Sequence, residues 1–247
     1  SESINQALIG GVRALRDSRR TIIASCFEHP AVNETLKFLE EEYGFKTVRL
    51  QVSRHGFVDL DQLDLVLSSD VAMVTCMLAN NEIGAIQPIA EMTKRIRAFE
   101  ASPKGNGPIL FHCDASQAGG KMVVDAKKLG VDYMTMAGHK IYATKGVGIL
   151  YIRDGSVEPK PIIHGANQEH GRRAGTENVI LCVGMGKAAE LINAHLAEDM
   201  KRMRELKQHL KVLLLERSPV NVRVNSSKNP DPYADEDDTD FYLSNTL

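Results

Sequence analysis

Apolar and polar positions along the chain alternate between two patterns, one typical of strands and one typical of helices. The strand-like runs cover 21–27, 46–52, 71–78, 107–114, 131–138 and 146–153. The helix-like runs cover 2–16, 28–45, 59–68 and 89–100, and a much longer one covers 179–217. Strands that alternate with helices predict an α/β fold, in which a mostly parallel sheet is sandwiched by helices. The long helix could cross from one domain to the next.

The bulk composition is that of an ordinary globular protein. The 247 residues are 43% apolar and 25% charged, with a formal net charge of -2. This charge gives no electrostatic reason to expect nucleic acid or an anionic membrane surface as a partner. No apolar run in the sequence approaches the length that spans a bilayer, so we expect no membrane partner. The acidic, proline-bearing segment 226–240 is expected to be a solvated loop rather than an interaction tail.

The four cysteines, Cys26, Cys76, Cys113 and Cys182, are far apart and form no CxxC pair. This spacing argues against a structural zinc site and against a disulfide framework. Three of them lie in strand-like apolar runs, so we expect buried core thiols in a reducing compartment, which favours the cytoplasm. The sequence gives no reason to expect a metal site.

Polar clusters follow four of the strand-like runs. They are Glu28-His29, Asn80-Asn81-Glu82, Asp114-Ala-Ser-Gln117 and Gly138-His139-Lys140. Each alone has an ordinary explanation as a helix cap, a turn or a solvated side chain. Parallel strands, however, bring their carboxyl ends to one edge of the sheet, where ligands bind. The four clusters would therefore offer an amine, a carboxylate, an imidazole and amides at one place.

Pyridoxal 5'-phosphate (PLP) is a cofactor that needs this set of groups. An amine forms its Schiff base, a carboxylate keeps its pyridine nitrogen protonated, and a flat group covers the ring. A nicotinamide cofactor would instead need a GxGxxG turn after the first strand, and none follows 21–27.

Several segments resemble a known family. FHCDASQAGGK, VDYMTMAGHKIYATKGVGILYI, MLANNEIGAIQPI and RRAGTENV are similar to segments of class V aminotransferase-like enzymes, and within them to cysteine desulfurases and selenocysteine lyases. The resemblance covers nearly the whole chain, with the motifs in family order. It implies a PLP-binding large domain at 1–178, a connecting helix at 179–217 and the start of an incomplete small domain at 218–247.

The resemblance also implies residue roles. Lys140 would hold the cofactor and move the substrate's Cα proton, and His29 would stack on the ring and take part in proton transfer. Asp114 would pair with the pyridine nitrogen, and Asn81 and Gln117 would reach the phenolic oxygen, with Asn81 also close to the substrate carboxylate. The phosphate would be held by Ser1, His139 and, from the neighbouring subunit of a homodimer, Thr176.

The chain also departs from the family pattern. Ala137 stands where many desulfurases have Ser, which removes one phosphate hydroxyl and tilts slightly towards the selenocysteine lyases. The family's catalytic cysteine loop and its carboxylate-binding arginine are absent, so the chain is expected to be truncated at both ends.

The predicted activity is removal of sulfur or selenium from L-cysteine or L-selenocysteine, which leaves L-alanine. A sulfur- or selenium-acceptor protein is a possible partner. Two alternatives stay open: a non-catalytic fragment or isoform that acts as a dimerisation partner, and another class V enzyme such as an aminotransferase or kynureninase-like hydrolase.

Overall fold

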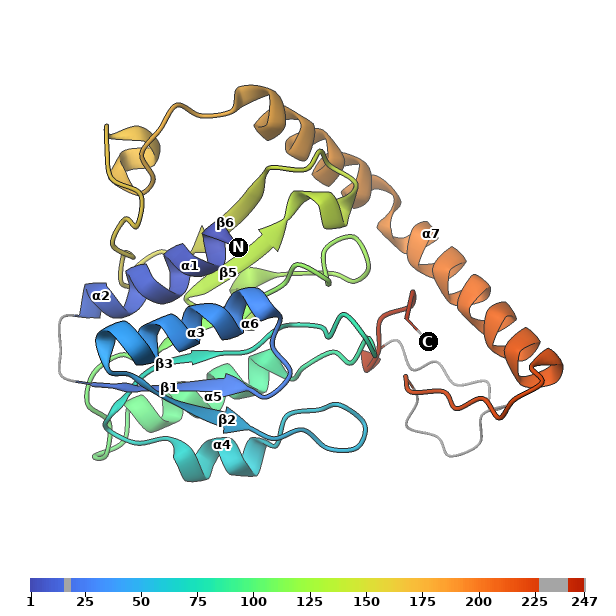
Figure 1. Ribbon diagram of the computed structural model, residues 1–247, viewed down its shortest axis with the longest axis horizontal. Coiled ribbons are helices and arrows are strands. Elements are labelled where there is room, and N and C mark those ends of the chain that lie inside the picture. Colours follow the sequence, from blue (N-terminus) through green and yellow to red (C-terminus); the bar gives the residue numbers. More distant parts are fainter. Residues whose placement is uncertain (16–18, 227–239, 247) are drawn as a thin grey trace.

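The computed structural model describes residues 1–15, 19–226 and 240–246. Its centre is a six-stranded sheet with the strand order β2-β1-β3-β4-β5-β6 (Figure 1). The strands are β1 (Thr21–Ser25), β2 (Lys46–Leu50), β3 (Val71–Thr75), β4 (Leu110–Asp114), β5 (Tyr133–Ala137) and β6 (Gly148–Ile152). Strands β1 to β5 pair in parallel, and β6 pairs with β5 in the antiparallel sense. The predicted α/β fold with a mostly parallel sheet is confirmed.

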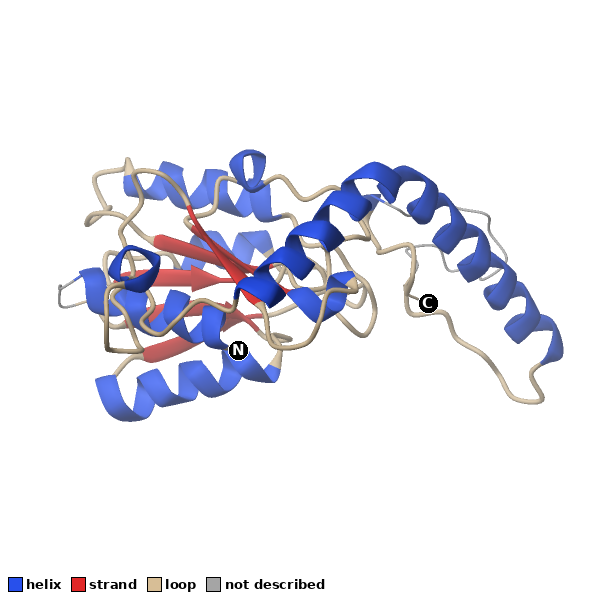
Figure 2. Cartoon of the chain, turned by 90° about the horizontal axis from the view of Figure 1, so that it is seen from above, coloured by secondary structure: helices blue, strands red, loops and turns tan. Residues whose placement is uncertain are grey.

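Helices cover both faces of this sheet (Figure 2). They are α1 (Glu2–Asn5), the π-helical turn η1 (Gln6–Gly10), α2 (Gly11–Leu15), α3 (Pro30–Tyr43), α4 (Leu60–Val66), α5 (Ile89–Glu100), α6 (Ala126–Leu129), the 3-10 turns η2 (Gly138–Ile141) and η3 (Gln168–Gly171), and α7 (Val179–Arg217). One hydrophobic core lies between the sheet and α4, α5 and α6, and contains Leu63, Met92 and Phe111. A second core lies between the opposite face and the helices α1 to α3, and contains Leu8 and Leu36.

The ends of α3 follow from local chemistry. His29 is the N-cap of the helix. Pro30 follows in the first helical turn, where its missing N–H leaves no hydrogen bond unmade. Gly44 ends the helix in the left-handed conformation with φ of 66°, which a residue without Cβ adopts without strain.

Strand β4 is shorter than predicted, because it begins at Leu110 instead of 107. Gly107 has φ of 84° and Pro108 has no N–H for a strand ladder, so the three residues before Leu110 lead into the strand as a loop. The short helix α6 was not predicted. Asp125 caps its start and the left-handed Gly130 ends it.

The amino-terminal edge of the sheet is held by a buried carboxylate. Asp132 is 2% exposed and accepts hydrogen bonds from Arg97 Nη2 at 2.6 Å and from the backbone N–H of Phe111 at 2.7 Å. It also pairs with Arg153 and accepts from Ser156 Oγ at 3.0 Å. This network lies at the opposite end of the strands from the polar clusters that the sequence singles out.

Helix α7 extends away from the sheet and has few buried residues (Figure 1, Figure 2). Its 39 residues match the predicted long helix, while its assignment as a connection between domains stays a prediction. Contrary to the sequence expectation, α7 is long and apolar enough to cross a membrane, by length and composition only. The helix also carries the Lys187–Glu190 ion pair at 2.7 Å, which a bilayer interior disfavours.

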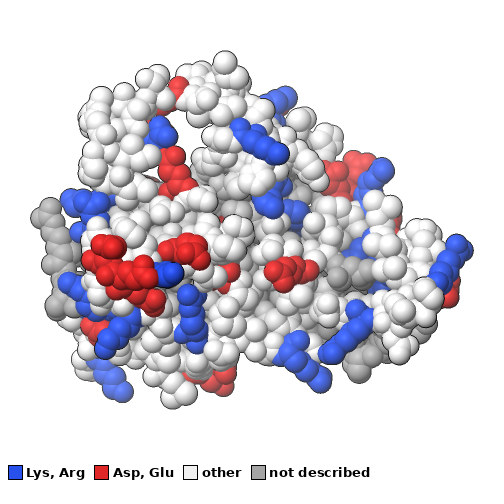
Figure 3. All heavy atoms as spheres, viewed as in Figure 1, with Lys and Arg blue, Asp and Glu red and all other residues white. Residues whose placement is uncertain are grey.

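On the face shown in Figure 3, acidic and basic side chains are interspersed without a continuous basic surface. Most of the acidic segment 226–240 lies outside the described residues, so the expectation of a solvated loop there stays a prediction.

Candidate active site

The carboxyl ends of the parallel strands bring the polar clusters to one edge of the sheet. Ser25 ends β1, Asp114 ends β4, and Ala137 ends β5, with the turn η2 directly after it. Asp114 is paired in register with Thr135 of β5, so the Asp114 and Lys140 clusters follow adjacent strands. Strands β3 and β4 are buried along their whole length, and the polar clusters follow at their carboxyl ends.

Asp114 is 6% exposed, and its two oxygens have different surroundings. Oδ1 accepts hydrogen bonds from the backbone N–H of Ser116 at 3.0 Å and from Thr135 Oγ1 at 3.4 Å. Within the described residues, no side chain or backbone N–H donates to Oδ2. The carboxylate is therefore oriented through one oxygen and offers the other to a ligand.

Lys140 lies in η2 and is exposed, and within the described residues its amine makes no hydrogen bond or ion pair. Nearby, Lys121 donates to the backbone oxygen of Gln117 at 3.0 Å and to Gln117 Oε1 at 3.4 Å. Burial and the neighbouring charge of Lys140 lower the pKa of Lys121 below its ordinary value. Lys121 thus contacts Gln117 and lies within the electrostatic reach of Lys140. His139 is exposed beside Lys140 in the same turn.

His29 has a position that the sequence does not reveal. Its Nδ1 accepts a hydrogen bond from the backbone N–H of Ala31 at 3.1 Å, and this bond caps α3. Since Nδ1 is the acceptor, a proton on the neutral ring is on Nε2. The capping bond fixes the orientation of the exposed imidazole at the carboxyl edge.

Glu28, the residue before His29, is buried. The sequence predicts no role for it. Its Oε1 accepts from Ser25 Oγ and from the backbone N–H of Met77 at 2.8 Å, while Oε2 is buried with no hydrogen-bond partner among the described residues. Burial raises the pKa of Glu28 to about 7, opposed by these two hydrogen bonds, and the charge of Asp114 adds to the rise. The turn after β1 therefore carries a carboxyl group that is partly protonated at neutral pH.

The two asparagines after β3 have different roles. Asn80 is buried, and its Oδ1 accepts from the backbone N–H groups of Glu82 at 2.9 Å and Ile83 at 3.0 Å. Asn80 thus builds the turn, and Asn81 is the exposed side chain that the turn presents.

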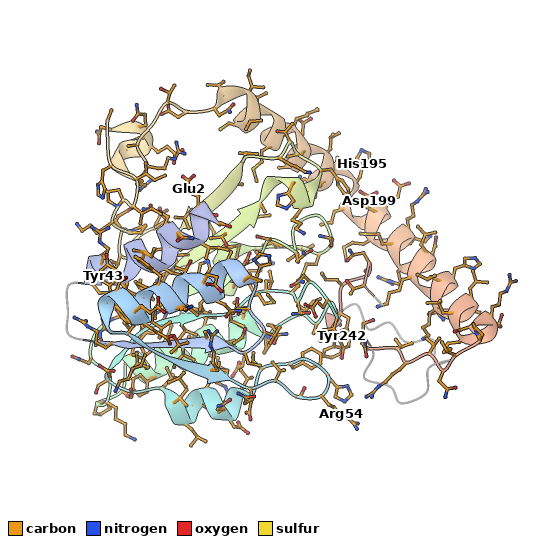
Figure 4. All side chains as sticks on the ribbon, in the orientation of Figure 1. Glu2, Tyr43, Arg54, His195, Asp199 and Tyr242 are labelled. Carbon is orange, nitrogen blue, oxygen red and sulfur yellow. The ribbon has the colours of Figure 1, made fainter. Side chains whose placement is uncertain are left out.

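A segment far along the chain supports this turn. The backbone N–H of Ile86 donates to Phe241 at 2.7 Å, and that of Leu243 donates to Gly84 at 2.8 Å. Tyr242 is 1% exposed and donates from its hydroxyl to His55 O at 3.0 Å, on the loop whose Arg54 is labelled in Figure 4. The apolar residues 241–243 therefore pair with the turn that carries Asn81.

Ser1 and Thr176 are less closely tied to the other candidates. Ser1 precedes α1 and its side chain makes no capping hydrogen bond. Gly148 pairs with Ala137 at the end of β5. A Cβ atom built on Gly148 would lie 3.8 Å from Ser3 Oγ. The start of α1 is therefore next to the carboxyl edge of the sheet. Thr176 is exposed in the loop before α7 and contacts none of the other candidates within the described residues.

The loop that carries Thr176 is anchored near the start of the chain. Arg173 Nε donates to Glu2 Oε1 at 2.7 Å, and Figure 4 labels Glu2 on α1. Gln168 Oε1 also accepts from the backbone N–H of Gly175 at 2.9 Å.

The expectation of buried thiols is right for Cys76 and Cys113 and wrong for Cys26 and Cys182, which are exposed. Strand β1 ends at Ser25, so Cys26 begins the turn to α3, and Cys182 lies on an exposed face of α7. Burial raises the pKa of Cys76 and Cys113 well above the ordinary thiol value, and these two side chains are therefore poor nucleophiles.

Comparisons with known proteins agree on a single family. The family model described as aminotransferase class-V matches residues 1–233. The chain is 43% identical over 209 residues to a protein of Dictyoglomus turgidum named cysteine desulfurase IscS, and 41% identical over 210 residues to one of that name from Methanosarcina thermophila. In both cases the aligned region is 85% of this chain and 50% of the relative.

Two solved structures have folds similar to that of this chain. A structure titled NifS-like protein superposes with a TM-score of 0.78 at 38% identity, over 87% of this chain and 57% of that one. DndA from Streptomyces lividans superposes with a TM-score of 0.79 at 31% identity, over 98% of this chain and 63% of that one. The chain spans about half the length of the curated relatives it matches.

Proposed function

The chain belongs to the class-V aminotransferase family, and from that premise we propose that it forms the cofactor-binding part of a PLP-dependent cysteine desulfurase. The proposed reaction removes sulfur from L-cysteine and leaves L-alanine. The observation that carries it is the placement of Asp114 and Lys140 at the ends of adjacent strands. Asp114 Oδ2 and the Lys140 amine make no hydrogen bond to any described residue. The relatives named cysteine desulfurase support the choice of reaction within the family.

The residues of the carboxyl edge fit PLP. The Oδ2 oxygen of the nearly buried Asp114 would accept a hydrogen bond from a protonated ring nitrogen, and the Lys140 amine would hold the aldehyde carbon. Asn81 and Gln117 would supply amide donors to the phenolic oxygen. Ser1 and His139, beside the start of α1 and in η2, would hold the phosphate where backbone N–H groups favour an anion. When bound, PLP supplies an electron sink for the bonds at the substrate Cα.

Proton transfer in this proposal uses two side chains. Lys140 Nζ would take the Cα proton and return it during the reaction, acting first as base and then as acid. His29 covers the ring, and since its Nδ1 is occupied by the Ala31 N–H, Nε2 is the atom through which it would hold or pass a proton.

We further propose that the site is completed in a homodimer, where Thr176 reaches the phosphate of the partner subunit. Large apolar side chains near this loop support a second copy, since Tyr142 is 94% exposed and Ile180 is 83% exposed. Sedimentation analysis is expected to give twice the mass of the chain. A monomer that still binds PLP tightly would contradict the role of Thr176.

The test of the reaction is amino-acid analysis after incubation of the PLP-loaded chain with L-cysteine and, in parallel, with L-selenocysteine. Alanine from cysteine in wild type and none in Lys140→Ala is the expected result. Lys127, exposed on α6 ahead of β5, is the matched control, and Lys127→Ala should leave the yield unchanged. Alanine from selenocysteine alone would assign the lyase, and a keto acid in place of alanine would indicate an aminotransferase. PLP binding without any product would support the dimerisation partner.

A further inference from the structure

A line of hydrogen-bonded side chains crosses the sheet beneath Asp114. His112 of β4 is fully buried, and its Nδ1 lies 2.8 Å from Thr75 Oγ1 on β3. On the other side, His112 Nε2 lies 3.3 Å from Thr135 Oγ1 on β5, and that hydroxyl donates to Asp114 Oδ1 at 3.4 Å. Both threonines are buried, so water does not substitute for any of these partners.

The charge of Asp114 sets the direction of every bond in this line. An ionised carboxylate only accepts hydrogen bonds, so Thr135 uses its one hydroxyl proton to donate to Asp114. Thr135 must then accept from His112, which places the imidazole proton on Nε2. The unprotonated Nδ1 in turn accepts from Thr75. One protonation state of His112 therefore satisfies all four groups.

We propose that His112, held between Thr75 and Thr135, is a positioning residue that keeps Asp114 turned so that Oδ2 faces the cofactor site. The hydroxyl of Thr135 holds this orientation through its hydrogen bond to Asp114 Oδ1. Burial lowers the pKa of His112 to about 4, against the opposing charge of Asp114, so the imidazole is neutral at physiological pH. A neutral imidazole orients Asp114 without pairing with its charge, which is left for the ring nitrogen.

The first test reads the tautomer directly, in the chain without cofactor. Heteronuclear NMR of the full chain with 15N-labelled histidine distinguishes protonated from unprotonated ring nitrogens among the eight histidines. The His112 signals are assigned by their loss in His112→Gln or, if that variant does not fold, by their shift in Thr75→Val. The expected result at pH 7 is a neutral ring with the proton on Nε2. A proton on Nδ1, or on both nitrogens, would overturn the proposal.

The second test rests on the proposed function and uses two matched variants. Thr135→Val and Thr75→Val each leave one His112 nitrogen without a partner, but only the first removes the donor to Asp114. PLP affinity, measured by absorbance titration, is expected to fall about tenfold or more in Thr135→Val, in keeping with the loss of a hydrogen bond to a charged group, and less than about threefold in Thr75→Val. Equal losses in the two variants would mean that His112 is only structural. If wild type bound no PLP, the proposed function would fail, and the NMR result would still decide the arrangement of the line.

Discussion

Glu28 makes the stability of the protein depend on pH in a direction that is unusual for a carboxyl group. Its pKa is raised from 4.5 to about 7, first by burial and then by the charge of Asp114, while the hydrogen bonds from Ser25 and Met77 oppose the rise. In the unfolded chain the carboxyl group ionises at its ordinary value. Between these two values the folded protein holds a proton that the unfolded chain has lost, so stability falls as pH rises.

The size of the effect follows from the shift. One pKa unit corresponds to about 1.4 kcal/mol, so the shift of Glu28 corresponds to about 3 kcal/mol of unfolding free energy. This stabilisation is fully present below about pH 4.5 and is lost as pH rises through about 7. Glu28→Gln removes the titration, and its amide oxygen can still accept from Ser25 and Met77. The amide NH₂ group takes the buried position of Oε2, where no described residue hydrogen-bonds to the carboxylate. This changes the unfolding free energy of the variant by an amount that does not depend on pH.

The assay is urea unfolding of wild type and Glu28→Gln, followed by circular dichroism from pH 4.5 to 8. The difference between the two unfolding free energies should change by about 3 kcal/mol across this range, with the variant gaining relative to wild type as pH rises. Glu34→Gln, at an exposed position on α3, is the matched control and should run parallel to wild type. A difference between wild type and Glu28→Gln that stays constant with pH would refute the reasoning.

Two further predictions concern the sheet. Asp132→Asn should lower the unfolding free energy by about 3 kcal/mol or more in denaturant titrations, because it leaves Arg97 and Arg153 without their buried carboxylate partner; a loss below about 1 kcal/mol would show that the arginines find other partners. Tyr133→Phe removes the hydroxyl that donates to the backbone oxygen of Val157 and should cost about 1 kcal/mol by the same measurement; unchanged stability would mean that this bond contributes nothing.

The sequence pattern predicted the strands and the site edge well, and the reason is physical. Strands β3 and β4 are buried on both faces and appear as continuous apolar runs, so the polar residues after them are conspicuous. The same pattern led directly to Asp114 and Lys140. Their placement after adjacent strands depends on the parallel pairing of β4 with β5. The overall α/β pattern favoured a parallel sheet, although the helix α6 between these two strands was not predicted.

Other features depend on contacts between distant residues and left no local signal. Glu28 is hydrogen-bonded to the backbone of Met77, which follows the end of β3, the neighbour of β1 in the sheet. The role of His112 depends on hydroxyls from the strands on both sides. The pairing of Phe241 with Ile86 joins segments that are far apart in the chain. Cys26 was misjudged for the opposite reason, because the apolar run 21–27 continues two residues beyond the end of β1.

The claim that Lys140 holds the cofactor is tested most directly by covalent trapping. The purified chain is titrated with PLP, reduced with borohydride and mapped by peptide mass spectrometry, with Lys140→Ala and Lys127→Ala alongside. The account predicts a visible absorbance band on binding and a pyridoxyl label on Lys140 in wild type and in Lys127→Ala. A label spread over several surface lysines, or a band and label that persist unchanged in Lys140→Ala, would contradict it.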